Sequence, residues 1–251
     1  MKKLSLLFII LLFALSLGCH CARFSFVVMG DNREGDVVFK DLIKKVNKDK
    51  DVRFIVSTGD FTLRGTEAEY EKYWKMCRAS KVKIYEAMGN HDIGFFNTGV
   101  KLFKEKYDET YYYFDRYGAR FIVIDNSRSK GLGRKQFTWL KDALDTTMPK
   151  FVFMHKPIFD PTGTYPYYIM TPKEDNESLN RLLVRAGVKY VFFGHIHGYG
   201  RAEKDGIVYI LTAGGGAPLY LPAFGGGYYH YVKVTVDGLK IYDKVVRIYN
   251  D

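Results

Sequence analysis

Cysteine is scarce in this chain, and its scarcity excludes a disulfide-based fold. The 251 residues include 3 cysteines, and two of them, Cys19 and Cys21, adjoin an apolar N-terminal stretch. Cys77 is left alone in the rest of the sequence, so no internal disulfide can form there. We expect Cys77 to pack as a small apolar residue on a helix. A hydrophobic core must therefore hold the fold together.

The sequence also lacks internal repeats, low-complexity tracts, linkers and known nucleic-acid-binding motifs. Its length suits one large α/β domain. The formal net charge is +10, from 38 basic and 28 acidic residues. A basic surface would attract phosphorylated substrates, anionic lipid headgroups or nucleic acid. Because the lysines and arginines are scattered, a solvated basic surface is the better interpretation, and a nucleic-acid partner is not expected.

Residues 1–22 have the pattern of an export leader. Met1-Lys2-Lys3 precedes an apolar stretch over 4–17, which is typical of a secretory signal. The segment Ser16-Leu17-Gly18-Cys19 loosely resembles a bacterial lipoprotein box, although leucine is usual three residues before the cysteine. Lipidation of Cys19, ordinary cleavage near Gly18 or Cys21, and an uncleaved anchor all remain open. Each alternative exports a domain of residues 23–251 to the periplasmic or extracellular face, with membrane contact only through the leader or its lipid.

Five short apolar runs each end at residue types that bind metals. Continuous apolar runs are typical of strands buried on both faces, and α/β folds bind ligands at the carboxyl ends of such strands. A single Gly-Asp or Gly-Asn is an ordinary turn, but the repetition favours a shared site. Carboxylate, amide and imidazole ligands together suit Mn, Fe, Zn or Co better than Ca or Mg alone. The runs end at Asp31, Asp60, Asn90-His91-Asp92, His155 and His195-Ile196-His197.

Helices and strands alternate along the first part of the chain, and strands follow one another at its end. Apolar spacing predicts helices over 36–48, 66–77, 99–107, 136–144 and 176–186, the second opened by a Thr66/Glu69 capping box. Hairpin strands are predicted over 111–115 and 120–125, and further strands over 207–211, 228–236 and 239–248. This order predicts an α/β fold, a four-layer αββα sandwich of two mixed β-sheets flanked by helices.

The residues at the strand ends can hold two divalent metal ions. Such a pair clamps an in-line displacement, generates hydroxide and neutralises charge on phosphoryl oxygens. Asp60 is the candidate bridging ligand; Asp31 and His197 would complete one site, and Asn90, His155 and His195 the other. His91 would sit beside the metals as a general acid. Asp92 would either orient the His91 ring or cap the following turn.

In order and spacing, these motifs resemble those of the calcineurin-like metallophosphoesterases, over roughly residues 24–248. The motifs are Gly30-Asp31, Gly59-Asp60, Gly89-Asn90-His91-Asp92, His155 and Gly194-His195-Ile196-His197. The resemblance implies the αββα fold, a dinuclear centre, and hydrolysis of phosphomonoesters or phosphodiesters in a small phosphorylated substrate. The ligand assignments above agree with those that the family's motifs imply.

One position departs from the family pattern. The first motif is usually Asp-x-His, whereas here Asp31 is followed by Asn32 and Arg33. Arginine keeps its proton and cannot replace an imidazole ligand. Arg33 would either grip the phosphate or form a salt bridge at the strand end. Arg64 occupies the place of a phosphate-contacting arginine in phosphoprotein phosphatases of this superfamily.

Two loops are expected to shape specificity, and two rival functions remain. Residues 156–175 carry four prolines and several aromatics, and residues 212–227 are rich in glycine, which allows close backbone approach. His230 is expected to be structural. The missing histidine in the first motif leaves open a degenerate binding module without turnover. The basic charge leaves open a nuclease, which would bind DNA or RNA with steep salt dependence.

Overall fold

The computed structural model describes residues 23–128 and 131–249. The predicted leader, residues 1–22, lies outside these ranges, so its alternatives stay predictions. Over the described ranges, no helix combines the length and the apolar character that a bilayer span requires.

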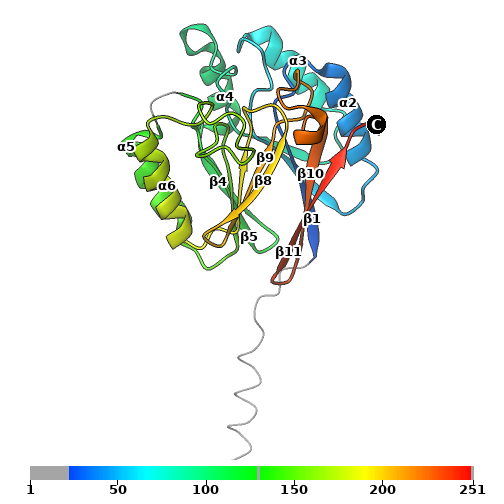
Figure 1. The fold of residues 1–251 in the computed structure, drawn as a ribbon. Coiled ribbons are helices and arrows are strands. Elements are labelled where there is room, and N and C mark those ends of the chain that lie inside the picture. The colour runs from blue at the N-terminus through cyan, green and yellow to red at the C-terminus, as the bar shows by residue number, and fades with distance from the viewer. Residues whose placement is uncertain (1–22, 129–130, 250–251) are drawn as a thin grey trace, which may run out of the picture.

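Two β-sheets pack face to face in the middle of the molecule (Figure 1). In the first sheet, with order β11-β10-β1-β2-β3, strands β1 to β3 are parallel and the other two antiparallel. In the second, with order β4-β5-β6-β7-β9-β8, the four inner strands are parallel and the edge strands antiparallel. The first sheet comprises β1 (Phe24–Met29), β2 (Val52–Ser57), β3 (Lys83–Glu86), β10 (His230–Asp237) and β11 (Lys240–Arg247), and the second β4 (Tyr112–Arg116), β5 (Ala119–Val123), β6 (Lys150–Phe153), β7 (Tyr190–Phe193), β8 (Tyr199–Lys204) and β9 (Ile207–Thr212).

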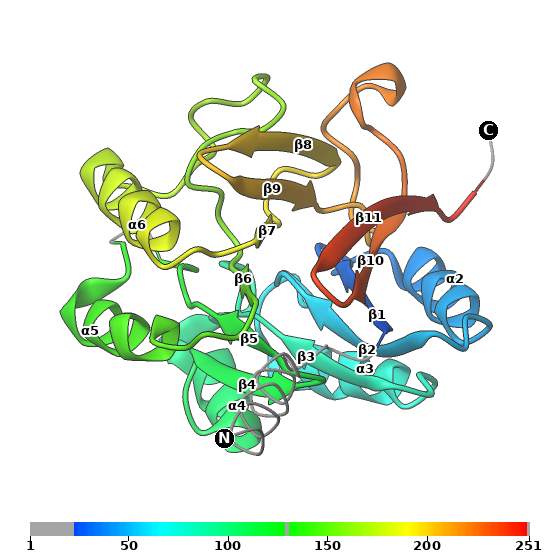
Figure 2. The same cartoon turned by 90° about the horizontal axis from the view of Figure 1, so that it is seen from below.

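Helices cover the outer face of each sheet, which confirms the four-layer αββα prediction (Figure 2). Helices α2 (Asp36–Val46), α3 (Glu67–Cys77) and α4 (Thr98–Tyr107) lie on the first sheet. Helices α5 (Gly133–Leu144) and α6 (Lys173–Arg185) lie on the second. Two short 3₁₀ turns, η2 (Phe95–Asn97) and η3 (Ala223–Gly225), interrupt the loops.

An aromatic core fixes the two sheets against each other. The ring of Phe26, on β1, is fully buried and stacks on Phe54 of β2, with ring centroids 5.3 Å apart. Across the interface the same ring meets Phe121 and Phe151 edge-on, at 5.3 and 5.1 Å. Such edge-to-face contacts are directional as well as apolar. They hold the two sheets in register, so that the carboxyl ends of their parallel strands meet at one edge of the molecule.

The structure differs from the sequence prediction in a few elements. Helices α5 and α6 begin at Gly133 and Lys173, each three residues before the expected start. Strand β8 was not predicted, and β10 begins at His230 rather than 228. The Thr66/Glu69 capping box of α3 is confirmed in both directions. Phe39, Leu42, Ile43 and Val46 form the buried face of α2, as their spacing predicts.

Strand β1 enters the fold at the end of the molecule opposite the loops that carry the predicted ligands (Figure 1). Phe24 is its first residue, and Asp31 follows its last residue by two positions. The strand therefore runs the full depth of the sheet, from the entry point of the chain to the candidate site.

Candidate metal centre

Three of the predicted ligands lie in left-handed backbone conformation at the ends of their strands. The φ angles are +58° at Asp31, +53° at Asp60 and +74° at His195. Residues with a side chain rarely adopt such angles, which cost of order 1–3 kcal/mol where they occur and cluster at functional sites. The three turns follow β1, β2 and β7, so the strain is concentrated at one edge of the two sheets.

Glycines beside these turns leave room for the carboxylates. A Cβ on Gly194 would lie 2.6 Å from Asp31 Oδ2, and a Cβ on Gly89 would lie 2.2 Å from Asp60 Oδ1. Only a residue without a side chain permits this approach of strand end to carboxylate. Gly89 and Gly194, which open the Gly-Asn-His-Asp and Gly-His-Ile-His segments, thus allow Asp60 and Asp31 to pack against the backbone.

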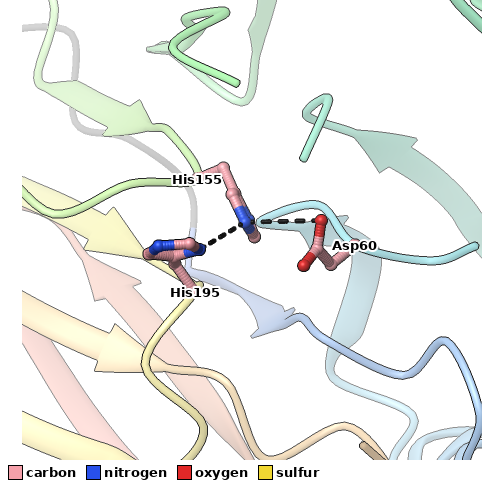
Figure 3. A group of neighbouring side chains, drawn as sticks. All are labelled: Asp60, His155 and His195. Carbon is pink, nitrogen blue, oxygen red and sulfur yellow. Dashed lines mark hydrogen bonds and ion pairs between the residues drawn. The ribbon is translucent and has the colours of Figure 1, made fainter. Parts of the chain in front are cut away.

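One group of ligand-type side chains contains Asp60, His155 and His195, which point toward one another (Figure 3). His155 Nε2 lies 3.4 Å from Asp60 Oδ1 and 3.2 Å from His195 Nδ1. Asn90 Oδ1 lies 3.0 Å from the same nitrogen. Asp60 and His155 are buried, whereas Asn90 and His195 are partly exposed. The structure therefore brings together all four side chains that were predicted to share one metal.

A second group contains Asp31, Asp60 and His197, all buried. His197 Nε2 lies 3.5 Å from Asp31 Oδ1. The backbone N–H of His195 donates to both oxygens of Asp31, at 3.1 Å each, which ties the end of β7 to the end of β1. Asp60 belongs to both groups, as a bridging ligand requires. In each group the ligand-type atoms lie within 4.8 Å of one another.

Backbone carbonyls fix the orientation of two of the imidazole rings. His155 Nδ1 lies 2.9 Å from the carbonyl oxygen of Thr58, and His197 Nδ1 lies 2.6 Å from that of Pro218. An Nδ1–H that donates to a carbonyl leaves the Nε2 lone pair toward the carboxylates. Metal-binding histidines usually make such a hydrogen bond through the ring nitrogen that does not bind the metal.

The electrostatics of the cluster suit a bound cation. Burial alone would lower the pKa of His155, but Asp60 and Asp31 raise it to about 9. Burial and the neighbouring His155 lower the pKa of His195 to about 3. Burial opposes ionisation of Asp60, yet His155 and His91 hold the pKa of its carboxyl below the usual range. Carboxylates without water around them need positive charge, which a divalent ion supplies. The donor set fits a divalent transition metal ion.

His91 stands at the rim of this cluster. Its backbone N–H donates to Asp60 Oδ1 at 2.9 Å, and its ring Nε2 lies 4.0 Å from Asp60 Oδ2. Its Nδ1 lies 2.7 Å from the carbonyl oxygen of Leu63. The ring is about one-third exposed, so it is open to a ligand while its position is held by the chain.

Arg33 faces the same rim. Its Nη1 contacts His91 Nε2, which accepts because a guanidinium only donates. Its Nε is buried without a hydrogen-bond partner among the residues that the structure describes, and it lies 3.9 Å from Glu34 Oε2. Arg33 therefore carries donor capacity for an anion at the centre, and the predicted salt bridge is at most a long contact.

The predicted contact between Asp92 and the His91 ring is not what the structure shows. The Asp92 carboxylate is fully buried and accepts from the backbone N–H groups of Asp60, Thr62 and Gly89, each at 2.8 Å. Burial and the charge of Asp60 raise the pKa of Asp92 to about 7. Asp92 thus joins the two ligand loops, and the Leu63 carbonyl orients His91 in its place.

Arg64 and His230 lie away from the ligand groups. Arg64 is exposed, and its backbone N–H donates to Glu69 Oε2 at 3.0 Å. No contact of its side chain with the ligands is recorded among residues 23–128 and 131–249, so its substrate role stays a prediction. His230 is buried between Thr212 and the Tyr228 carbonyl, consistent with the structural role expected of it.

Sequence reasoning missed Asn126, which holds the His155 loop. Its Oδ1 accepts from the backbone N–H groups of His155 and Lys156, at 2.9 and 3.0 Å. Its Nδ2 donates to the Lys156 carbonyl at 2.6 Å. Asn126 follows β5 at the end of another apolar run, so the strand-end pattern that identified the candidate ligands could have identified this residue as well.

The glycine-rich segment after β9 closes over the end of β1. Gly215 donates to the Gly30 carbonyl and Ala217 to the Asp31 carbonyl, both at 2.8 Å. A Cβ on Gly215 would lie 2.4 Å from the Gly30 oxygen. Glycine here permits the close backbone approach that the sequence predicted, and the approach is to the Asp31 turn.

Comparison with known proteins agrees with this geometry. Residues 24–199 match the family described as Calcineurin-like phosphoesterase. A mouse serine/threonine-protein phosphatase, CPPED1, is 29% identical over 166 residues, which cover 58% of this chain and 53% of that protein. The matched region spans about half of that mouse protein, 53%, and 40% of its human counterpart.

Two solved structures show the same fold. Purple acid phosphatase PPD1 from yellow lupin superposes with a TM-score of 0.76 at 16% identity, over 92% of this chain and 52% of that one. A dimetal phosphatase from Danio rerio gives a TM-score of 0.68 at 14% identity, over 91% and 97%. At identities this low, the superpositions show the fold alone. The chemistry must be argued from the residues of the site.

Proposed function

Because the chain belongs to the calcineurin-like phosphoesterase family, we propose that it hydrolyses phosphomonoester or phosphodiester bonds at a centre of two divalent metal ions. The observation that carries this proposal is the position of Asp60, shared by two groups of ligand-type side chains. A shared carboxylate is what two adjacent ions require. The bound ions would supply a nucleophilic water at neutral pH and stabilise charge on the phosphoryl oxygens.

The chain's own residues divide into two sets around Asp60. Asp31 and His197 would hold one ion with it, and Asn90, His155 and His195 the other. The first set has one nitrogen fewer, since Arg33 stands where the family pattern has histidine. Mn, Fe, Zn and Co all suit this mixture of oxygens and imidazoles.

His91 is the proposed general acid for the leaving oxygen. Its Nδ1 is held by the Leu63 carbonyl, so the proton for the leaving group must come from Nε2. In the structure that nitrogen accepts from Arg33. A substrate phosphate would draw the guanidinium away, because a bidentate contact with an anion is stronger than a contact with a neutral ring. Arg33 would thus bind the phosphate and free Nε2 to take up a proton.

Metal content and turnover test the proposal together. We expect about two equivalents of transition metal per chain, and hydrolysis of p-nitrophenyl phosphate or its diester. Asp60→Asn should lose metal and turnover, whereas His91→Ala should retain metal and lose turnover about 100-fold or more. Asp142→Asn, on the exposed face of α5, is the matched control and should change neither. A wild-type protein with one metal or none and no turnover would instead support a binding module, which the arginine in the first motif favours.

We also propose export of the domain, with a small phosphorylated molecule as its substrate. The support is the charged and apolar pattern of residues 1–22, together with scattered basic residues that form no nucleic-acid motif. Intact mass of the mature protein distinguishes the alternatives. A lipid-modified Cys19, a new N-terminus near Gly18 or Cys21, and an intact leader give three different masses. A soluble fraction that retains residues 1–22 inside the cell would refute export.

A further inference from the structure

Two tyrosines outside the ligand set stand against the histidines that follow β7. The ring of Tyr220 stacks on His197, with centroids 4.0 Å apart and planes at 22°. The ring of Tyr168 lies 6.1 Å from that of His195. The two tyrosine rings are 6.2 Å apart and nearly perpendicular, at 69°. Together Tyr168 and Tyr220 form an aromatic wall beside the metal centre.

The wall is fixed in place by a third tyrosine and by the backbone. Tyr165 lies 5.5 Å from Tyr168 and 6.1 Å from Tyr220, and its hydroxyl donates to the Tyr220 carbonyl at 3.0 Å. The backbone N–H of Tyr220 donates to the His197 carbonyl at 2.9 Å. The loop after β6 and the loop after β9 are therefore joined to each other and to a ligand segment. A preorganised surface of this kind loses little entropy when a ligand binds.

The wall is nonetheless open to solvent. Tyr168 is 47% exposed and Tyr220 38% exposed, although His197, on which Tyr220 stacks, is buried. Core packing does not account for aromatic faces left in water at the rim of a charged centre. Tyrosine offers a flat apolar face and little conformational entropy to lose, and aromatic faces of this kind stack on planar rings.

The wall adjoins the place where the phosphate is expected. The positive charge of Arg33, the proposed phosphate ligand, opposes the rise that burial causes in the pKa of Tyr220, so the two side chains lie near each other. The Tyr220 ring also stacks on His197, a candidate metal ligand. With the phosphate held between arginine and metal ions, the group esterified to it is left to face Tyr220 and Tyr168.

We propose that Tyr168 and Tyr220 select phosphate esters whose alcohol carries a planar ring, either a nucleoside or a phenol. This inference rests on the proposed function. A ring in the leaving group stacks on the wall, whereas an alkyl group gains no such contact. Tyr168 is the specificity-determining residue to test, because Tyr220 also packs on a ligand and its loss would disturb the centre.

The test compares kcat/KM for adenosine 5′-monophosphate, phenyl phosphate and glycerol 2-phosphate. Tyr168→Ala should lower kcat/KM about tenfold or more for a ring-bearing substrate, and change it less than about twofold for glycerol 2-phosphate. Tyr168→Phe should keep most of the activity, because the ring remains. Tyr167→Ala is the matched control, since its side chain is 92% exposed. The substrate that responds, nucleotide or phenol, identifies the ring. An equal loss on all three substrates, or a loss on neither ring substrate, overturns the inference.

Calorimetry separates this failure from a failure of the proposed function. If the wild-type protein hydrolyses none of the three, nor p-nitrophenyl phosphate or its diester, the proposed catalysis is refuted while the wall can still be tested. Adenosine 5′-monophosphate and phenyl phosphate are then titrated against inorganic phosphate. Tighter binding of either ester than of phosphate in the wild type, lost in Tyr168→Ala and kept in Tyr167→Ala, supports the wall. Affinity for both esters no greater than that for phosphate, or no binding of any of them, refutes it.

Discussion

Arg33 should give the candidate centre a different balance of metal and substrate binding from that of a histidine at the same position. Its guanidinium cannot ligate an ion. Within residues 23–128 and 131–249, its Nε has no hydrogen-bond partner, and its Nη1 contacts the ring nitrogen of His91. Arg33→His should add a nitrogen ligand and therefore tighten binding of the ion that Asp31, Asp60 and His197 would hold, by about tenfold. It should also remove a phosphate contact and raise KM by a similar factor. Metal retained after dialysis and the KM for p-nitrophenyl phosphate measure the two effects.

The control for this exchange is Arg33→Lys, which keeps the charge without the planar fork. It should raise KM without improving metal retention. If the Arg33→His protein binds metal no better than wild type, residue 33 does not decide how tightly the site of Asp31, Asp60 and His197 binds its ion.

His230 should make the fold sensitive to acid at a position away from the metals. Burial lowers its pKa from 6.5 to about 4. The unfolded chain therefore binds this proton first, so the stabilisation is complete above pH 6.5 and is lost as the pH falls toward 4. The free energy involved is about 3 kcal/mol.

Urea unfolding at pH 7, 5.5 and 4.5 checks this effect. His230→Asn, which does not titrate, should lose less stability than wild type across that range, whatever its stability at pH 7. Equal losses in the two proteins would show that His230 is not the responsible group.

The candidate site could be predicted from sequence where each candidate ligand is identified by its immediate neighbours in the chain. Asp31, Asp60 and His195 each follow a buried strand and a glycine, so the strand-end pattern marked them. The bonds of Asp92 could not be foreseen, because its carboxylate reaches backbone 30 and 32 residues away. Tyr168 and Tyr220 meet only in the folded chain, and no spacing in the sequence links them.

At the scale of elements, prediction worked where a strand or helix has a buried face. The central strands read as apolar runs because both their faces are covered. Strand β8 (Tyr199–Lys204) was missed because it lies at a sheet edge and four of its six residues are polar or glycine. The first turns of α5 and α6 were missed for a similar reason: Arg134, Lys135, Glu174 and Asp175 supply no apolar spacing.

The capping box of α3 is an element-level feature with a measurable effect. The Thr66 hydroxyl accepts from Glu69 N, and the Glu69 carboxylate accepts from Thr66 N at 3.1 Å. Thr66→Ala should destabilise the protein by about 1 kcal/mol without changing its metal content. Chemical denaturation measures the loss, and Thr138→Ala, exposed in α5, serves as the control. A loss of stability no larger than that of the control would show that the capping box does not stabilise α3 measurably.

Bound metal ions should stabilise the whole molecule, because the candidate ligands come from both sheets. Asp31, Asp60 and Asn90 follow strands of the first sheet, and His155 and His195 follow strands of the second. Ions bound between them would join the two layers at their carboxyl edge. Chelation should therefore lower the unfolding free energy by about 3 kcal/mol relative to protein in metal at 100 times Kd.

Differential scanning calorimetry with and without chelator measures this shift, and added Mn²⁺ or Zn²⁺ should reverse it. Asp60→Asn should unfold at the same temperature with or without metal, whereas Asp142→Asn should respond like wild type. A chelated wild-type protein of unchanged stability would mean that no ion links the sheets.

The direction of β1 has a consequence for how the domain would work beside a surface. The chain enters at Phe24, and the site lies at the far end of that strand, about 20 Å away along six residues. A tether through the residues before Arg23 would hold the domain by its base. The candidate metal centre would then face outward, and the molecules that reach it would arrive from the surrounding fluid rather than from the bilayer underneath.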